Sequence, residues 1–304
     1  MWFKNLLVYR LPADWSVSAA ELEEQLARRP LQPCGPFDMS SSGWVPPATS
    51  GRLLHTVNQQ HLLALGVDQK LLPATVIRQV TAERAAALAV EQGFPVGRRQ
   101  QRDLRLRVTE ELRARALIRR RVTRAWIDPE NRWFIVDAAG IARAEELVNT
   151  LRDTLGSLAV RFLDTERSPQ QSMATWLMQG DAPARFALDQ DLELQTPDAA
   201  KATVRWTRHA LDPREIQTHL KAGKHPVRLG LTWRDRISFV LTDKLHVKRV
   251  EFLEIAPERE DGDDIDPAEQ FDIDFAVMAG ELAKLLEELS EALGGQPLKQ
   301  AAAA

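Results

Sequence analysis

The stretch from Arg98 to Arg124, RRQQRDLRLRVTEELRARALIRRRVTR, decides how this chain is interpreted. It holds eleven arginines against three acidic residues, a local charge of +8 in a chain whose formal net charge is -3. Apolar residues recur at every fourth position, which is the period of an amphipathic helix: Leu104, Val108, Leu112 and Ala116. The sequence therefore predicts one helix over the whole stretch, with a polar face rich in guanidinium groups.

Three acidic residues can neutralise part of this charge at i,i+3 or i,i+4 spacing. The expected pairs are Asp103 with Arg107, Glu110 with Arg113, and Glu111 with Arg115. Eight arginines keep no carboxylate nearby in sequence: Arg98, Arg99, Arg102, Arg105, Arg119, Arg120, Arg121 and Arg124. Because the planar guanidinium fork matches a phosphate, we predict that these eight contact DNA. A solvated helix face, or pairing with the acidic C-terminal region, is the alternative.

A second basic group is more dispersed: Arg205, Arg208, Arg214, Lys221, Lys224 and Arg228. Lys221 and Lys224 lie at the end of a predicted helix, where cations are also favoured for structural reasons. We include these two lysines among the predicted DNA contacts. The arginine stretch contains no aromatic residue, which favours contact with the phosphate backbone over reading of bases.

The sequence lacks the motifs of common enzyme chemistry. There is no GxGxxG, GxxxxGK[ST], HExxH, GxSxG or CxxC pattern, and the six histidines show no metal-ligand spacing. His55 and His61 could face each other across a predicted hairpin, but ordinary strand positions explain both. Cys34 has no histidine near it in sequence, which favours a partly buried thiol over a nucleophile. We expect a protein that is not an enzyme and needs no metal or cofactor.

Composition indicates the compartment. The single cysteine rules out a disulfide within the chain and fits a reducing environment. No apolar run approaches the about 20 residues that a membrane helix needs. The first residues, MWFKNLLVYRLP, are typical of a strand rather than of a signal peptide. We therefore expect a cytoplasmic protein that does not bind membranes.

The acidic C-terminal region leaves an enzymatic alternative open. Its acidic run comprises Glu258, Glu260, Asp261, Asp263, Asp264, Asp266 and Glu269, and the position of Gly262 excludes an EF-hand loop. A metal-dependent nuclease could still use Asp272, Asp274 or Glu281, because carboxylates hold the metals of such sites. A solvated loop, or a partner for the arginines, is the structural alternative.

Capping, turn and periodicity signals divide the chain into short elements. We expect helices over 18–29, 74–92, 141–155, 172–178, 212–221 and 271–293, and strands over 2–11, 53–57, 61–65, 125–127, 133–136, 158–163, 186–194, 201–206, 227–233, 237–242 and 247–255. Residues 38–47 are expected to be loop. Helices do not alternate with single strands, so the fold class is α+β, with antiparallel sheets, packed helices and a projecting helical hairpin.

Four parts of the chain follow from this order of elements. Residues 1–73 form an N-terminal α+β part, and 74–124 form the basic, projecting helical hairpin. Residues 125–180 form a hairpin-helix-strand part that packs with 1–73. Residues 181–304 form a C-terminal α+β lobe with a long terminal helix.

Short segments spread from end to end carry a family resemblance. They are Trp2-Phe3-Lys4-Asn5-Leu6, Tyr9-Arg10-Leu11, Pro33-Cys34-Gly35, Gly43-Trp44-Val45-Pro46-Pro47, Trp126-Ile127-Asp128, Leu155-Gly156-Ser157-Leu158, Ala222-Gly223-Lys224, Phe271-Asp272 and Gly280-Glu281-Leu282. None is a catalytic signature, but their order and spacing together are specific. On these segments the chain resembles the RdgC family of recombination-associated proteins.

The resemblance implies a homodimer closed into a ring around a basic central hole. It also implies a nucleoid-associated protein that binds double-stranded and single-stranded DNA without sequence preference and restrains the RecA recombinase by occupying its DNA. The arginine stretch is not among the matching segments, so its assignment to DNA rests on charge. Besides the nuclease, a protein-interaction scaffold, in which the arginine helix docks on an acidic partner, remains an alternative.

Overall fold

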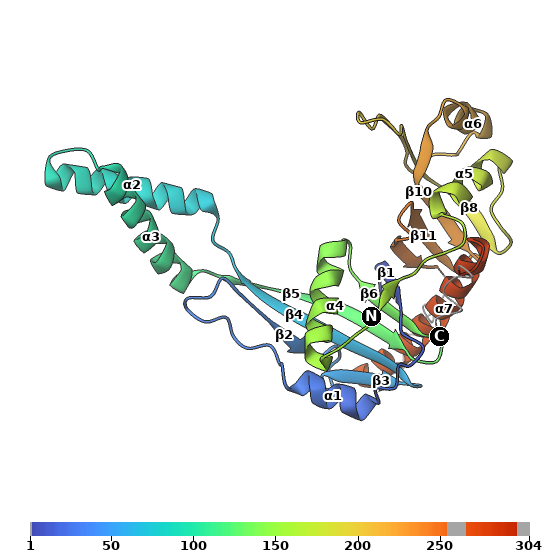
Figure 1. Cartoon of the computed structure of the whole chain (residues 1–304), viewed down its shortest axis with the longest axis horizontal. Helices are drawn as coiled ribbons and strands as arrows, with labels where there is room; N and C mark the ends of the chain where they lie inside the picture. The colour runs from blue at the N-terminus through green and yellow to red at the C-terminus, as the bar shows by residue number, and fades with distance from the viewer. Residues whose placement is uncertain (1, 254–265, 297–304) are drawn as a thin grey trace. The chain divides into compact units, whose positions relative to one another are not determined.

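The computed structural model describes residues 2–253 and 266–296. The chain divides into two compact units. Unit 1 comprises Met1–Gln25, Pro46–Leu63 and Thr123–Ala304, and unit 2 comprises Leu26–Val45 and Ala64–Val122. Three elements cross from one unit into the other along the chain: α1 (Ala19–Ala27), β4 (Gln60–Lys70) and β5 (Ile118–Asp128), all labelled in Figure 1.

An antiparallel sheet forms the framework of unit 1. Its strands follow the order β5-β6-β1-β12-β11-β10-β8-β9. Their bounds are β1 (Asn5–Arg10), β6 (Trp133–Asp137), β8 (Phe186–Gln195), β9 (Thr203–Trp206), β10 (His225–Trp233), β11 (Ile237–Thr242) and β12 (Val247–Phe252). Two short strands lie outside this order: β3 (Leu54–Val57) pairs with β4, and β7 (Arg161–Phe162) pairs with β1. The α+β class is confirmed.

Four helices lie wholly in unit 1, and a capping side chain precedes three of them. They are α4 (Ile141–Leu155), α5 (Pro169–Gln179), α6 (Pro213–Lys221) and α7 (Pro267–Ala292). Helices α5, α6 and α7 each begin with proline after a capping residue whose side chain accepts a backbone N–H: Ser168, Asp212 and Asp266. No helix in the described ranges is long and apolar enough to cross a bilayer.

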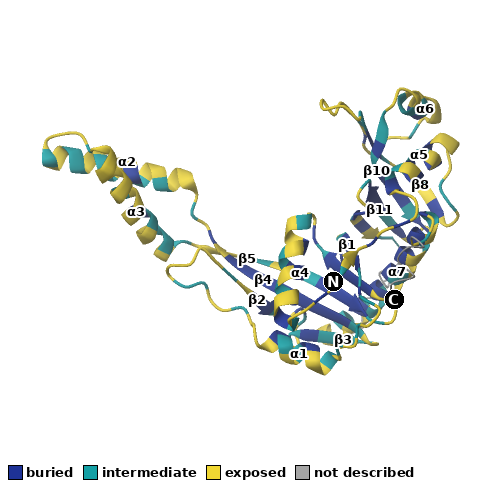
Figure 2. Ribbon diagram, viewed as in Figure 1, coloured by how far each residue is buried: buried dark blue, intermediate teal, exposed yellow. Residues whose placement is uncertain are grey.

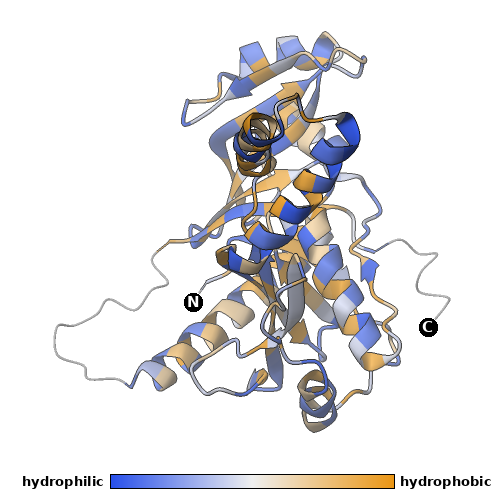
Figure 3. Ribbon diagram, turned by 90° about the vertical axis from the view of Figure 1, so that its left-hand side faces the viewer, coloured by the Kyte–Doolittle hydropathy of each residue, from blue (hydrophilic) through white to orange (hydrophobic). Residues whose placement is uncertain are grey.

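The core of unit 1 lies between the sheet and α7. Helix α7 buries one apolar face, which includes Phe275, Met278, Leu282, Leu285, Leu286 and Leu289. Figure 3 shows that the helices of the chain carry both hydrophilic and hydrophobic residues. Trp126 and Trp133 are buried in this core, and the indole Nε1 of Trp126 donates to Gln60 Oε1 at 2.6 Å.

Two tight hairpins fix the strand register in unit 1. Asn58 and Gln59 join β3 to β4 with φ of 48° and 61°. Arg234 and Asp235 join β10 to β11 with φ of 50° and 56°. Two consecutive residues with positive φ are the mark of a type I′ turn, whose twist matches that of the flanking strands. Both hairpins agree with the elements expected from the sequence.

The single tyrosine of the chain lies deep in unit 1. The ring of Tyr9 stacks on that of Phe162, with centroids 4.3 Å apart, and its buried hydroxyl has no hydrogen-bond partner among the described residues. Burial raises the pKa of Tyr9 to about 12, and the nearby Glu145 acts in the same direction. The neutral phenol is thus strongly favoured in the folded chain.

Unit 2 contains the helical hairpin, the whole of β2 and parts of β4 and β5. Helices α2 (Ala74–Gln92) and α3 (Arg98–Arg115) form the hairpin, and the strands follow the order β2-β4-β5. The expected loop over 38–47 is wrong, because β2 (Ser40–Val45) pairs with β4 from Ser40↔Gln69 to Val45↔Ala64. Serine and glycine weaken a strand prediction, but a paired neighbour far away in sequence overrides propensity.

The end of α7 is held by one carboxylate. Glu288 accepts from Trp233 Nε1 at 2.7 Å, from Arg185 Nη1 at 2.7 Å and from Arg234 Nη2 at 2.6 Å. Burial alone would raise the pKa of Glu288, but the hydrogen bonds from Arg234 and Trp233 outweigh it and hold the pKa below its ordinary value. This contact ties α7 to the β10–β11 hairpin.

We expect Glu288→Ala to lower the free energy of unfolding by about 1–3 kcal/mol, because it leaves the buried N–H of Trp233 without an acceptor. The depressed pKa means that the stabilisation is present above the ordinary glutamate pKa of 4.5 and is lost as pH falls below it. Urea unfolding as a function of pH measures this. Glu291→Gln, at an exposed position of the same helix, is the matched control.

Candidate nucleic-acid interface

The helical hairpin of unit 2 has very little core. Thr81 is the buried residue of α2 and Val108 that of α3. An ion pair between the helices adds to this contact, since Arg84 Nη1 lies 2.7 Å from Glu111 Oε2. Figure 2 shows both helices as mostly exposed. Nearly the whole polar surface of α3 therefore faces solvent.

The predicted DNA contacts on α3 are all exposed and carry no ion pair among the described residues: Arg98, Arg99, Arg102 and Arg105. The least exposed apolar positions of α3 are Leu104, Val108 and Leu112, which keep the predicted four-residue period, whereas these four arginines are exposed. The guanidinium groups of this part of the stretch are thus available to an external anion.

The prediction of one helix from Arg98 to Arg124 is wrong in its last third. Helix α3 ends at Arg115, and Ala116 is its C-cap with extended backbone angles. Strand β5 follows from Ile118 and pairs with β4 and β6. The β-branched Ile118, Val122 and Thr123 favour a strand, and pairing within the sheet decides the outcome.

Arg120 has an ion-pair partner inside unit 2 that is distant in sequence. Its Nε lies 2.7 Å from Asp68 Oδ1 and its Nη2 lies 2.8 Å from Asp68 Oδ2, a two-pronged ion pair between β5 and β4. The side chain of Asp68 is only 5% exposed. The hydrogen bonds from Arg120 lower the pKa of Asp68. Arg120 therefore has a structural role, which removes it from the set of freely available arginines.

The local ion pairs expected within α3 give way to longer-range contacts. Glu111 pairs with Arg84 of α2, which lowers the pKa of Glu111, and Arg115 adds a smaller effect in the same direction. Arg113 donates from Nη1 to the carbonyl oxygen of Phe37 at 3.0 Å instead of pairing with Glu110. Since Phe37 and Arg84 lie far away in sequence, no local pattern could have identified these contacts.

The remaining arginines of the stretch occupy different settings along β5. Arg119 is exposed and has no ion pair within the described ranges. Arg121 is half-buried and already takes part in an interaction. Arg124 belongs to unit 1, where it lies opposite Asp137 in the β5–β6 register. Burial raises the pKa of Asp137, and the charge of Arg124 acts in the opposite direction. Arg119 is thus the most accessible of these three.

The two predicted lysine contacts lie at the C-terminal end of α6 in unit 1. Lys221 is exposed in the last turn, whereas Lys224 is half-buried with its Nζ 3.2 Å from His219 Nδ1. In the nearby sheet, Glu193 holds two other cations of the second basic group, with Arg205 at 2.7 Å and Arg228 at 3.7 Å. Lys221 is therefore the freer of the two lysines.

The carboxylates proposed for a nuclease site have separate partners. Asp272 lies 3.1 Å from His55 Nε2, Asp274 accepts from the Gln270 side chain at 2.9 Å, and Glu281 lies 3.4 Å from an Arg236 nitrogen. Over the described ranges, no three His, Cys, Asp or Glu side chains gather as a metal site would require. Of the acidic run, Glu258, Glu260, Asp261, Asp263 and Asp264 lie outside the described residues.

The histidines of the β3–β4 hairpin have ordinary structural contacts. His61 is buried, with its Nδ1 3.0 Å from the Thr56 hydroxyl, and burial lowers its pKa. Burial also lowers the pKa of His55, although Asp272 acts in the opposite direction. The thiol of Cys34 is half-buried and donates weakly to the carbonyl of Asp38 at 3.6 Å.

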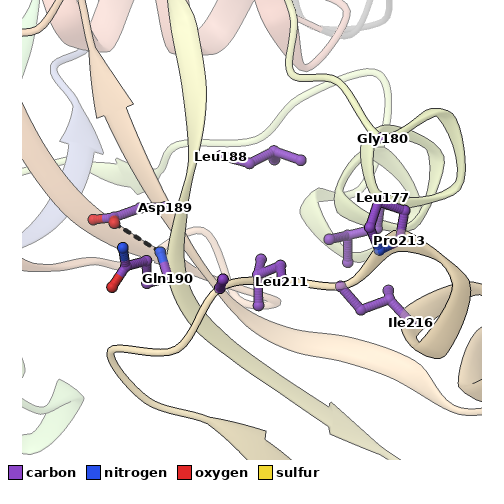
Figure 4. A pocket seen from close by; sticks show the side chains of 9 residues that line it. Leu177, Gly180, Leu188, Asp189, Gln190, Leu211, Pro213 and Ile216 are labelled. Carbon is purple, nitrogen blue, oxygen red and sulfur yellow. Dashed lines mark hydrogen bonds between the residues drawn. The ribbon is translucent and has the colours of Figure 1, made fainter.

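An apolar pocket of about 310 Å³ lies in unit 1 between α5, β8 and the start of α6 (Figure 4). Leu177, Leu188, Leu211, Pro213 and Ile216 form most of its lining. The figure shows the polar groups of Asp189 and Gln190 on one side, where the Asp189 carboxylate accepts from the backbone N–H of Gln190. Its lining offers no cation for a phosphate, so this pocket is separate from the arginine surface.

Comparison with known proteins gives a consistent result over both units. A family model described as "RdgC: Putative exonuclease, RdgC" matches residues 1–296. The Recombination-associated protein RdgC of Dechloromonas aromatica (strain RCB) is 47% identical over 299 residues, covering 97% of this chain and 98% of that protein. That of Cupriavidus pinatubonensis is 48% identical over 296 residues, covering 97% and 99%, and that of Herminiimonas arsenicoxydans is 45% identical over 300 residues, covering 99% and 100%.

We expect Arg120→Gln to lower the urea midpoint of unfolding, because it leaves the buried Asp68 carboxylate without its two donors. Arg119→Gln removes the same charge from the neighbouring position and should leave the midpoint unchanged. The pKa of Asp68 is depressed, so the difference between the variants is present above the ordinary aspartate pKa of 3.8 and shrinks as pH falls below it. Equal midpoints for both variants at neutral pH would contradict the structural role of Arg120.

Proposed function

This chain belongs to the RdgC family, and from that membership and its arginine surface we propose that it binds DNA without sequence preference. It acts as a homodimer, binds duplex and single-stranded DNA, and restrains recombination by occupying the DNA that the RecA recombinase needs. In this proposal it alters no covalent bond of the DNA, and it works in the cytoplasm on the nucleoid.

One observation carries the DNA proposal. Arg98, Arg99, Arg102 and Arg105 on α3, and Arg119 on β5, are exposed guanidinium groups of unit 2 without ion pairs among the described residues. Like charges crowded on one helix repel each other unless an anion lies between them. A phosphate backbone supplies such anions in a regular row. The availability of these five arginines therefore favours DNA binding over the alternative of an internally neutralised helix face.

The spacing of these arginines suits a phosphate backbone. Arg98, Arg102 and Arg105 recur at intervals of three or four residues, so their side chains share one side of α3. At about 1.5 Å per residue they extend over about 10 Å of helix. A DNA strand carries one phosphate per about 3.4 Å of duplex axis, so about three phosphates lie along that length. Contacts of this kind position a protein on DNA and carry no sequence information.

Exposed apolar side chains support the homodimer. Among the described residues, ten of the thirteen large hydrophobic side chains that are exposed lie in unit 2. They are Phe37, Met39, Leu71, Val76, Val90, Phe94, Leu106, Leu117, Ile118 and Val122. Single exposed apolar residues are normal, but such a concentration on one part of a chain favours burial against another protein surface. A second copy of unit 2 is the partner we propose for the exposed apolar residues of α2, α3 and β5.

Two other functions compete with this one. A metal-dependent nuclease would use the carboxylates of α7, and the family description includes the word exonuclease. A protein-interaction scaffold would place the arginines of α3 on an acidic protein. Both alternatives predict outcomes that differ from those of a DNA-coating protein in the same binding experiment.

We expect the triple variant Arg98→Gln, Arg102→Gln, Arg105→Gln to bind duplex DNA more weakly and with less dependence on salt. For B-DNA the slope of log K against log salt is about -0.9 per phosphate contact, so losing three contacts should make it less negative by about 2.7. Fluorescence anisotropy over a salt series measures both quantities. A control with Arg143→Gln, Lys201→Gln and Lys244→Gln removes three exposed cations from unit 1.

An unchanged slope in the triple variant would take the α3 arginines off the DNA-contact surface. Absence of wild-type binding in dilute buffer would overturn the proposed function as a whole. Incubating labelled duplex with Mg²⁺ or Mn²⁺ tests the nuclease alternative, because a coating protein leaves the strands uncut. Equal binding to polyglutamate and to DNA would favour the scaffold.

We expect the purified chain to have twice its monomer mass of 34.2 kDa when measured by light scattering at micromolar concentration. Val90→Asp places a charge on the most exposed apolar residue of α2 and should shift the equilibrium toward monomer, because the charge would have to be desolvated in the interface. A wild-type monomer at all concentrations would contradict the homodimer and the ring that the family resemblance implies.

A further inference from the structure

A tight turn in unit 2 presents an exposed aromatic ring. Over Gly35–Asp38, the Asp38 N–H donates to the Gly35 carbonyl at 3.2 Å, and the Gly35 N–H donates to the Asp38 carboxylate at 3.2 Å. Phe37 lies within this turn, and its side chain is left 78% exposed. The backbone is therefore fixed by its own hydrogen bonds while the ring points into solvent.

The cationic side chains of Lys70 and Arg113 donate hydrogen bonds to the backbone carbonyls of this turn. Lys70, which is only 5% exposed, donates from Nζ to the carbonyl of Gly35 at 2.6 Å and to that of Pro36 at 2.9 Å. Arg113 donates to the carbonyl of Phe37 at 3.0 Å. The acceptors of Lys70 and Arg113 are neutral carbonyls, and the turn itself contributes one negative charge, the Asp38 carboxylate. The two cations therefore leave the turn and its supports with a net positive charge.

Burying a lysine with neutral partners is costly, and exposing a phenyl ring to water is costly too. An arrangement that does both is expected where the ring has a function in its exposed position. A rigid aromatic side chain loses little conformational entropy when it binds. An exposed aromatic ring offers a nucleobase a surface to stack on, and the net positive charge of its supports favours the phosphate that comes with the base.

We propose that Phe37 is a base-stacking residue for single-stranded DNA. The inference rests on the proposed function, because it adds a contact with a base to the contacts with phosphates. In a duplex the faces of the bases are covered by their neighbours, so Phe37 contributes to single strands and to unpaired ends. The α3 arginines serve both forms of DNA, whereas Phe37 distinguishes them.

Another exposed phenylalanine of unit 2 provides a matched comparison. Phe94 lies on the connection between α2 and α3 and is 58% exposed. Its carbonyl accepts from the neutral side chain of Gln92 at 2.9 Å, not from a cation. Phe94 thus shares residue type, unit and exposure with Phe37 but lacks the charged support.

The experiment compares Phe37→Ala, Phe37→Leu, Phe37→Trp and Phe94→Ala with the wild-type chain. Fluorescence anisotropy measures binding to an oligothymidylate of about 15 nucleotides, within the usual site-size range, and to a duplex of the same length. We expect Phe37→Ala to weaken single-strand binding by roughly 5- to 150-fold and duplex binding by less than about 2-fold. Phe37→Trp should retain single-strand affinity, Phe37→Leu should not, and Phe94→Ala should behave as the wild type.

A direct readout accompanies the affinities. Oligothymidylate containing iododeoxyuridine, irradiated in the complex, should form a cross-link that mass spectrometry locates at Phe37. Unchanged single-strand affinity in Phe37→Ala would overturn the inference. So would an equal loss for both DNA forms accompanied by a lower molar mass in light scattering, which would place Phe37 in a contact between copies. Loss of wild-type duplex binding would instead overturn the proposed function itself.

Discussion

The two-residue period of a β-strand limits how many arginines of β5 the fold can neutralise. Arg120 faces Asp68 of β4, and its neighbour Arg119 points to the opposite side of the strand, where it is exposed. On α3, the four-residue spacing of Leu104, Val108 and Leu112 uses one stripe of the helix for packing, and Arg98, Arg99, Arg102 and Arg105 stay exposed. Both geometries direct guanidinium groups outward, and the basic surface of unit 2 is a result of these two periodicities.

Unit 1 is stabilised by a different kind of contact. Its sheet is covered by α7, whose apolar face is buried along most of its length, and Glu288 fixes the end of that helix to the β10–β11 hairpin. Unit 2 has Thr81 and Val108 as the buried residues of its two helices. Unit 1 therefore has an extensive core, whereas the helical hairpin of unit 2 has a small one and leaves most of its surface exposed.

The fold was largely predictable where the signals are local. Asp212 caps α6 where a helix was expected to begin, and the antiparallel α+β class follows from the order of elements. Helices α5 and α7 begin at Pro169 and Pro267, before the expected starts at 172 and 271. Strand β2 was missed because its serines and glycine have low strand propensity and only its pairing with β4 makes it a strand. Arg98, Arg99, Arg102 and Arg105 could be identified as candidate DNA contacts from the local charge of the sequence alone. Asp68, Lys70 and Phe37 could not, because their contacts join residues distant in sequence.

The chromophores of this chain are distributed unevenly between the units. Tyr9 is the only tyrosine and lies in unit 1, whereas Trp44 is the single tryptophan of unit 2 among the eight in the chain. Because Tyr9 keeps its proton to about pH 12 in the folded chain, tyrosinate absorbance at lower pH reports unfolding of unit 1. The intrinsic fluorescence of a variant that retains only Trp44 would follow unit 2 by itself. The two halves of this molecule can therefore be observed separately with ultraviolet light, without attaching a dye to either.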